Sequence, residues 1–234
     1  MSATHGEANY ILLQGPDWVA LNKPSGMSTH NDVSGSGGGS SGSFTEDALS
    51  YVTRVLNAKP GSVSPVHRLD RETSGILLFA TTREAASRLQ QAWGVNSGSK
   101  KFYRAVVRGK LTGTGLWDFP ISDKSEGREN PAGRASDRKE ALTKFEVVRA
   151  TDFLSDLRIE LLTGRQHQIR KHSRLAKHGL VGDTRYGEAS HARKMESLYG
   201  VSRLMLHAEK LNLLEIELEA PLPPEFEKFF GDKP

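Results

Sequence analysis

Segments of strand length constrain the fold of this chain more than any other feature. "GILLFA" (75–80) is a continuous apolar run, and "LRIELLT" (157–163) alternates apolar with charged side chains, as buried and half-buried strands do. These segments outnumber the expected helices and do not alternate regularly with them, which favours an α+β fold over a doubly wound sheet. Further strands are expected at 18–23, 101–109, 141–148, 203–207 and 211–218.

Three longer helices are expected, at 45–56, 81–93 and 164–179, and a short one begins at the prolines near the C-terminus. Thr45 is the expected N-cap of the first helix. Thr81 and Glu84 have the spacing of a capping box in the second. Gly179 is expected to close the third.

The rest of the chain indicates one cytoplasmic domain. Among 234 residues there is no cysteine, which excludes disulfides, thiolate nucleophiles and cysteine-bound zinc. No segment reaches the ~18 apolar residues of a membrane span, and the N-terminus lacks the apolar core of a targeting signal. The Gly/Ser stretch 34–43 predicts a flexible loop over 31–44, because too few residues precede it for a separate domain. We therefore expect a single domain over 1–234.

The stretch "VHRLDRETSG" (66–75) places one carboxylate, Asp70, between Arg68 and Arg71. An exposed ion pair is one interpretation. The other is a reactive carboxylate, because neighbouring positive charge keeps an aspartate ionised and an ionised oxygen can act as nucleophile or base. The arginines would also screen Asp70 from the phosphates of a polyanion.

A second basic region lies between Thr163 and Gly179 and has no acidic residue. On a helix, Arg170, Arg174 and Lys177 share one face, which suits either a solvated surface or phosphate binding. The spacing of its histidines does not match a metal-binding pair, and no carboxylate lies nearby in the sequence, so no metal site is expected. The formal charge of +4 is compatible with nucleic acid but does not require it.

Three segments together resemble one family. "LNKPSGMSTH", "HRLDRETSGILLFA" with "KFYRAVVRG", and "LLTGRQHQIRKH" with "GLVGDTRYG" are similar, in order and spacing, to the motifs of RluA-type RNA pseudouridine synthases. The resemblance covers about residues 10–220. It implies isomerisation of uridine to pseudouridine in ribosomal or transfer RNA, without cofactor or metal. The implied fold is a mixed, largely antiparallel sheet with flanking helices and a central RNA-binding cleft.

The resemblance also assigns roles to residues. Asp70 matches the catalytic aspartate, Arg165 the arginine that pairs with it, and Tyr103 the tyrosine that stacks on the target base and can transfer a proton. Leu162 lies near the aliphatic residue on the other face of the base. Arg68 matches the residue that fills the gap left by the flipped nucleotide. The full set of residues expected to contact RNA is Lys23, His67, Arg68, Arg71, Leu162, Gln168, Arg170, Lys171, Arg174 and Lys177.

Some features depart from the family pattern. Many relatives carry an N-terminal S4-type RNA-binding domain, and none is expected here. The Gly/Ser loop and the polar insertion 122–140 are not motif-like. The alternatives are a non-catalytic RNA-binding or assembly protein on the same fold and, less well supported, a metal-dependent phosphodiesterase. A monomer is expected, and both the nucleophilic and the glycal route stay open.

Overall fold

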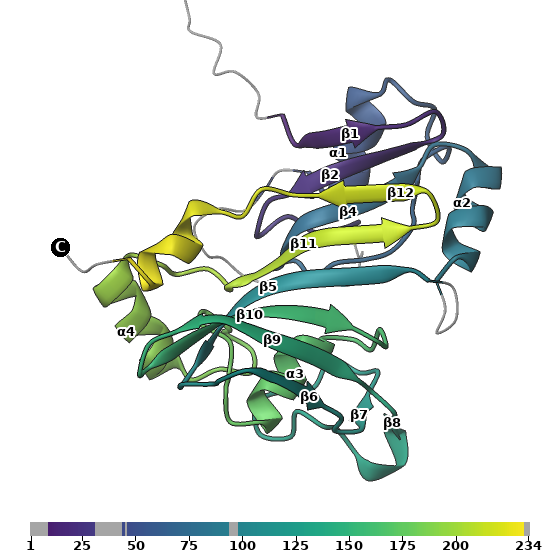
Figure 1. Cartoon of the computed structure of the whole chain (residues 1–234). Coiled ribbons are helices and arrows are strands. Elements are labelled where there is room, and N and C mark those ends of the chain that lie inside the picture. The colour runs from purple at the N-terminus through teal and green to yellow at the C-terminus, as the bar shows by residue number, and fades with distance from the viewer. Residues whose placement is uncertain (1–8, 31–43, 45, 94–97, 232–234) are drawn as a thin grey trace, which may run out of the picture.

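The computed structural model describes residues 9–30, 44, 46–93 and 98–231. Most of the strands join one mixed sheet of ten strands (Figure 1). Its main path runs β1 (Ile11–Gln14), β2 (Trp18–Lys23), β4 (Ser74–Ala80), β11 (Leu206–Leu213), β5 (Lys100–Arg108), β10 (Leu154–Leu161), β9 (Thr143–Ala150) and β6 (Thr114–Trp117). The pairing of β4 with β11 is parallel, and the other strand pairs among the described residues are antiparallel. The predicted α+β class with a largely antiparallel sheet is confirmed.

Strand β4 is fully buried because helices cover both of its faces. Leu77 and Phe79 pack in the same core as Val52 of α1 (Ala48–Val55). The alternate residues of β4 belong to a second core, which includes Leu89 of α2 (Arg83–Gln91). Since successive strand side chains point to opposite faces, a continuous apolar run such as "GILLFA" is what a strand between two cores requires.

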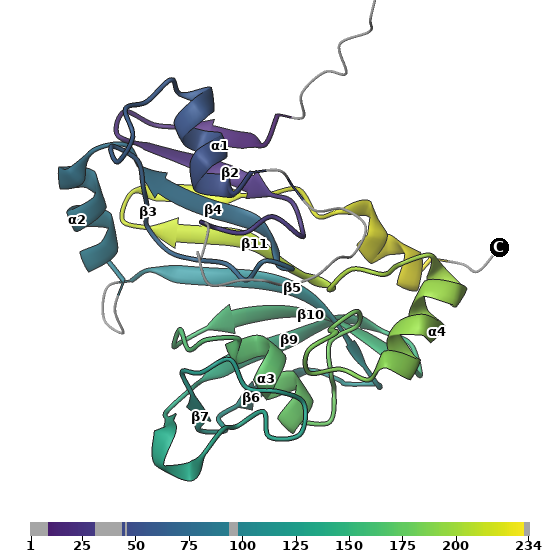
Figure 2. The ribbon, with the colours of Figure 1, turned by 180° about the vertical axis from the view of Figure 1, so that it is seen from behind.

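Helix α3 (Gln168–Leu175) packs through Ile169 into the same core as α1. Figure 2 shows the two helices on the same side of the sheet. Helix α4 (Ala189–Tyr199) was not predicted; it ends at Gly200, whose left-handed φ of 64° is typical of a helix C-terminus. The smaller elements are β3 (Ser64–Pro65), β7 (Ile121–Ser122), β8 (Arg138–Lys139), β12 (Ile216–Glu219) and two 3-10 helices, Ala135–Asp137 and Pro224–Phe229.

Several predicted boundaries are wrong. Asp47 caps α1 by accepting a hydrogen bond from Ser50 N, and the expected cap Thr45 lies outside the described residues. Thr82 caps α2, not the preceding threonine. Helix α3 ends four residues before Gly179, because Lys177 already has a left-handed φ of 66°.

The strand predictions near the C-terminus also shift. Residues 203–205 precede β11, and the strand predicted over 211–218 is the end of β11, a turn at Leu214 with φ 53°, and β12. Strand β1 was not predicted, and the connection expected over 110–140 contains β6, β7 and β8. Apart from Phe44, the expected loop 31–44 lies outside the described residues. No helix in the described part of the chain is long and apolar enough to cross a membrane.

Candidate active site

The loop after β2 clamps the backbone around Asp70. Thr29 Oγ1 donates to Leu69 O at 3.0 Å and accepts from Leu69 N at 3.3 Å. Ser25 Oγ donates to Glu72 O at 2.6 Å. Because these contacts hold both sides of Asp70, the segment "LNKPSGMSTH" fixes the loop that carries the carboxylate.

Lys23 contributes to the same clamp. Its side chain is fully buried, and Nζ donates to Met27 O at 2.8 Å and to Pro24 O and Arg71 O at 3.1 Å each. These contacts use all three donors of an ammonium group. Burial lowers the pKa of Lys23 to about 7, although the nearby charge of Asp70 opposes the shift. The expectation that Lys23 contacts RNA is therefore wrong, since its charged group is enclosed by backbone.

Arg170 is the arginine that reaches Asp70. Its Nη1 lies 3.3 Å from Asp70 Oδ2 and 3.2 Å from Glu72 Oε2. On its other side, Nε and Nη2 grip the two carboxylate oxygens of Asp183 at 2.9 Å each. Burial opposes the charge of Arg170, but its hydrogen bonds with Asp183 and the nearby carboxylates raise its pKa above the usual value. Arg170 is thus a fixed, charged donor to Asp70, not a surface contact for RNA.

Arg165 does not pair with Asp70, which corrects the sequence-based assignment. Its Nε donates to Glu140 O at 3.1 Å and its Nη1 lies 3.4 Å from Asp123 Oδ2. Both partners belong to the polar region around 122–140. Arg165 and Arg170 lie in the same "GRQHQIR" string, five residues apart, and the structure directs only the second toward Asp70.

His167 lies on the other side of the Asp70 carboxylate. Its Nε2 is 3.6 Å from Asp70 Oδ1, and its Nδ1 is 2.9 Å from the hydroxyl of Tyr186. Burial lowers the pKa of His167, and the charge of Asp70 partly opposes this.

The pairing of strands β4, β11 and β5 places Tyr103 near the loop that carries Asp70. Gly75 pairs in register with Ala208 of β11, and Ala208 pairs with Tyr103 of β5. A side chain at Gly75 would meet Ala208 O at 2.2 Å, so the close approach of these strands requires glycine there. Tyr103 is buried, and burial followed by the charge of Asp70 raises the pKa of its hydroxyl. The tyrosine therefore keeps its proton beside the carboxylate.

These groups make the region a candidate active site, and comparison with known proteins gives the family of the chain. The sequence model described as "RNA pseudouridylate synthase" matches residues 17–175, more than half of the chain. The chain belongs to this family. The predicted resemblance to RluA-type synthases is confirmed, and with it the reaction, isomerisation of uridine to pseudouridine in RNA.

Relatives match most of this synthase. It is 36% identical over 214 residues to "tRNA pseudouridine synthase C" of Pasteurella multocida, covering 86% of this chain and 84% of the relative. The protein of the same name in Vibrio cholerae is 32% identical, with 91% and 88% covered. The solved structure "Human RNA Pseudouridylate Synthase Domain Containing 4" has a TM-score of 0.72 at 23% identity, covering 93% of this chain and 90% of that chain. This last likeness supports the fold.

Three further residues that were expected to contact RNA have their side chains directed into the protein interior. His67 accepts a hydrogen bond from Leu78 N at 3.2 Å, and burial lowers its pKa to about 3, so it stays neutral. Lys171 is fully buried and donates to Ser122 O at 2.8 Å and Lys124 O at 2.7 Å, which ties the polar insertion to α3. The ring nitrogens of His67 and the ammonium group of Lys171 are buried or hydrogen-bonded inside the protein, so neither side chain reaches RNA.

Gln168 is the third. Its Oε1 accepts from Thr163 Oγ1 at 2.8 Å and from Arg165 N at 3.0 Å. Its Nε2 donates to Leu142 O at 3.0 Å and to Thr143 Oγ1 at 2.9 Å. With its whole amide engaged, Gln168 holds the start of α3 against β9 and does not reach the surface.

The other residues expected to contact RNA remain accessible. Arg68, Arg71, Leu162 and Lys177 are exposed, and Arg174 is half-buried with Nη1 3.4 Å from Glu188 Oε1. Arg174 and Lys177 line a surface hollow of about 600 Å³ at the end of α3. Its lining also includes Arg108, Gly109, Arg128, Pro131, Leu175, His178 and Glu188.

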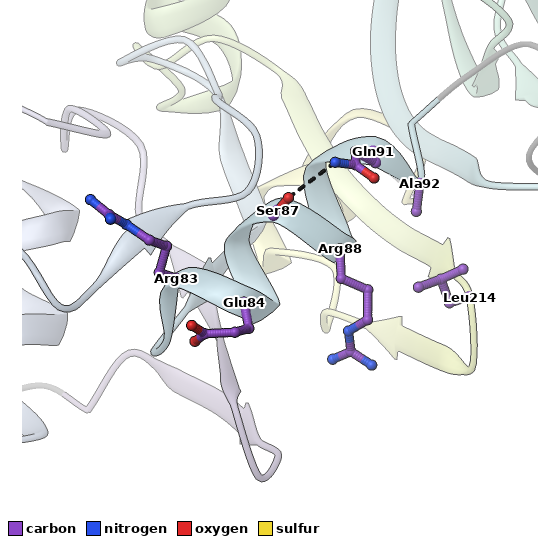
Figure 3. A pocket seen from close by; sticks show the side chains of 7 residues that line it. All are labelled: Arg83, Glu84, Ser87, Arg88, Gln91, Ala92 and Leu214. Carbon is purple, nitrogen blue, oxygen red and sulfur yellow. Dashed lines mark hydrogen bonds between the residues drawn. The ribbon is translucent and has the colours of Figure 1, made fainter.

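A second hollow, of about 770 Å³, lies on α2 (Figure 3). It is lined by Arg83, Glu84, Ser87, Arg88, Gln91, Ala92 and Leu214, and includes none of the residues around Asp70. Size alone therefore does not locate the active site of this synthase.

Sequence reasoning missed two side chains of the candidate site, Asp183 and Tyr186, which contact Arg170 and His167. Both lie in the turn 182–187, the "GDTRYG" string that was quoted for the resemblance without a role. Asp183 also accepts hydrogen bonds from Arg185 N at 2.9 Å and Tyr186 N at 3.0 Å, which orders the turn. Within the described ranges, no group of three or more His, Cys, Asp or Glu side chains is arranged to hold a metal ion.

Proposed function

We propose that this synthase isomerises a uridine of a transfer RNA, with Asp70 as the nucleophile. The observation that carries the proposal is the position of Asp70: its Oδ2 faces Arg170 at 3.3 Å, while the carboxylate keeps about a quarter of its surface exposed at 24%. A nucleophile needs both an oriented charge and access to substrate. The curated relatives named "tRNA pseudouridine synthase C" support transfer RNA over ribosomal RNA.

The proposed chemistry begins when a carboxylate oxygen of Asp70 bonds to C1′ of the flipped nucleotide and the glycosidic bond to N1 breaks. The detached uracil turns, C5 bonds to C1′, and the aspartate leaves as a carboxylate. The balance requires that C5 loses one proton and N1 gains one. The hydroxyl of Tyr103 keeps its proton at neutral pH, so it is placed to take part in this exchange.

Other residues have proposed roles in holding RNA. Arg68 is exposed two residues before Asp70 and would fill the gap in the stacked strand. Leu162 is 42% exposed and would face the base from the other side. Arg174 and Lys177, with the neighbouring arginines of their hollow, would contact phosphates beyond the target. Since one chain supplies all these groups, we propose a monomer, acting in the cytoplasm where bacterial RNA is found.

The test is carbodiimide-based mapping of pseudouridine in transfer and ribosomal RNA from cells with and without the gene. We expect a transfer-RNA site to disappear with the gene and to return with the wild-type protein, but not with Asp70→Asn. The variant should bind RNA equally well or slightly better, because a negative charge near phosphate is removed. If Asp70→Asn is active, the assignment of Asp70 as nucleophile is rejected. If the pseudouridine that disappears with the gene lies in ribosomal RNA alone, the assignment of transfer RNA as substrate is rejected.

Tyr103→Phe tests the proposed proton transfer. The change keeps the ring, whose stacking on a base is worth ~1–3 kcal/mol. We expect RNA affinity to be retained and the single-turnover rate to fall by ~10²-fold or more. A rate close to wild type would leave stacking as the only role of Tyr103. The non-catalytic alternative predicts that no pseudouridine site depends on the gene and that the purified protein forms no pseudouridine in single-turnover assays.

A further inference from the structure

The turn 182–187 reaches both oxygens of Asp70 through two different residues at the start of α3. Asp183 grips Arg170, which faces Oδ2, and Tyr186 contacts His167, which faces Oδ1. We propose that His167 is a positioning residue that orients the Asp70 carboxylate, with its ring held by the Tyr186 hydroxyl. This inference rests on the proposed role of Asp70 as nucleophile.

The hydrogen-bond partners fix the orientation of the imidazole. Burial raises the pKa of Tyr186 to about 12 and lowers that of His167, so both are neutral near pH 7 and the ring carries one proton. If Nδ1 carried it, the lone pair of Nε2 would face the carboxylate of Asp70, which can only accept. The consistent arrangement has Tyr186 donating to Nδ1 at 2.9 Å and the Nε2 proton directed at Asp70 Oδ1.

The distance from Nε2 to Oδ1, 3.6 Å, is slightly longer than a hydrogen bond. Contacts of this kind commonly shorten when substrate binds. Tyr186 itself has little freedom to move, because it is 1% exposed and its ring lies 5.5 Å from the guanidinium of Arg170. The ring of His167 is therefore held from behind, with its donor directed toward the nucleophile.

The backbone of His167 gives independent support. Its φ is 54°, in the left-handed region that is uncommon for residues other than glycine, although histidine, asparagine and aspartate adopt it more often than the rest. His167 is the N-cap residue of α3, yet its side chain makes no capping hydrogen bond. The side chain contacts Tyr186 and Asp70 instead.

Positive charges surround the ring. Arg170, Arg185 and Lys171 all disfavour a proton on His167, and Asp70 favours one. A neutral imidazole can direct a donor at Asp70 without adding a second full positive charge beside Arg170. The two oxygens of the nucleophile are thus oriented by an ion pair on one side and a neutral donor on the other.

Two variants of His167 separate positioning from packing. His167→Asn keeps an amide near Nδ1 for Tyr186 and tolerates the left-handed backbone, but it loses the group that reaches Asp70. His167→Gln places an amide donor near the position of Nε2. We expect the single-turnover rate on transfer RNA to fall about 10- to 100-fold in His167→Asn, and His167→Gln to recover most of that loss. RNA affinity and Tm should stay close to wild type in both.

Tyr186→Phe should lower the rate to an intermediate level, because the ring stays packed while His167 loses its hydrogen bond. The proposal is overturned if His167→Asn reacts as fast as wild type, or if both His167 variants lose rate and Tm equally, which would indicate a packing role. Asp70→Asn is measured alongside. Activity in Asp70→Asn would reject the proposed function, whereas an inactive Asp70→Asn beside a fully active His167→Asn would reject only this inference.

Discussion

The two ends of α3 carry the same kinds of basic side chain in opposite environments. At the first end, Arg170 and Lys171 are 3% and 0% exposed. At the other end, Arg174 is half-buried and Lys177 is exposed. The difference arises from what covers each end: the turn 182–187, the Asp70 loop and the insertion close over the first, and only an open hollow lies at the second.

The partners of these side chains differ in the same way. Arg170 meets carboxylates and Lys171 meets backbone carbonyls, so their geometry is fixed before RNA arrives. Arg174 makes a longer, partly exposed pair with Glu188 at 3.4 Å, which water and phosphate can replace. The basic residues of α3 and of the turn that follows it therefore divide into a buried part beside Asp70 and an accessible part that we propose binds the substrate backbone.

Among the basic residues of this comparison, the largest effect is expected from Arg170→Lys. Lysine keeps the charge but loses the planar fork that grips Asp183 at two points while reaching Asp70. We expect the single-turnover rate to fall by about 100-fold or more, with RNA affinity nearly unchanged. Arg165→Lys is the matched control, and its rate should stay within a few-fold of wild type. Equal losses in the two variants would contradict the assignment of Arg170 as the partner of Asp70.

A smaller effect is expected at the C-terminal end of α3, and it concerns RNA affinity and not the reaction rate. Replacing Arg174 and Lys177 together by glutamine should weaken RNA binding and reduce its salt dependence by roughly one to two units of slope. The rate at saturating RNA should not change. Arg193→Gln with Lys194→Gln on α4 removes the same charge from another exposed surface. If this control flattens the slope equally, the far end of α3 has no special part in binding.

The smallest effect is expected from Lys23, a buried lysine whose ammonium group contacts backbone carbonyls and no carboxylate. Its pKa is lowered from 10.5 to about 7, so between these values the unfolded chain holds a proton that the folded chain lacks. The free energy of unfolding should therefore rise with pH from about 7 to 10, relative to Lys23→Met, by at most about 1.4 kcal/mol per pH unit. Urea unfolding at pH 7, 8 and 9 measures the difference. A constant difference between the two proteins would show that Lys23 does not titrate in this window.

Part of this protein could be predicted from local patterns alone. The apolar run 75–80 identified the central strand because a strand buried on both faces needs no polar side. The "HRLD" and "GRQHQIR" strings identified the family and the position of Asp70 in the chain. Helix caps were misplaced by one or more residues, since neighbouring threonines and aspartates compete for the same role and only the local geometry selects Thr82 and Asp47.

The choice of Arg170 over Arg165 was decided by the tertiary structure. The sequence presents two arginines in one motif, and Asp70 is 100 residues away from the one that it meets. Sequence alone also predicted that four polar residues contact RNA, namely Lys23, His67, Gln168 and Lys171. In the structure their side chains form hydrogen bonds inside the protein instead. Residue type and spacing determine which charges a chain carries. Which of these charges are buried, and against what partner, depends on contacts between segments far apart in the sequence.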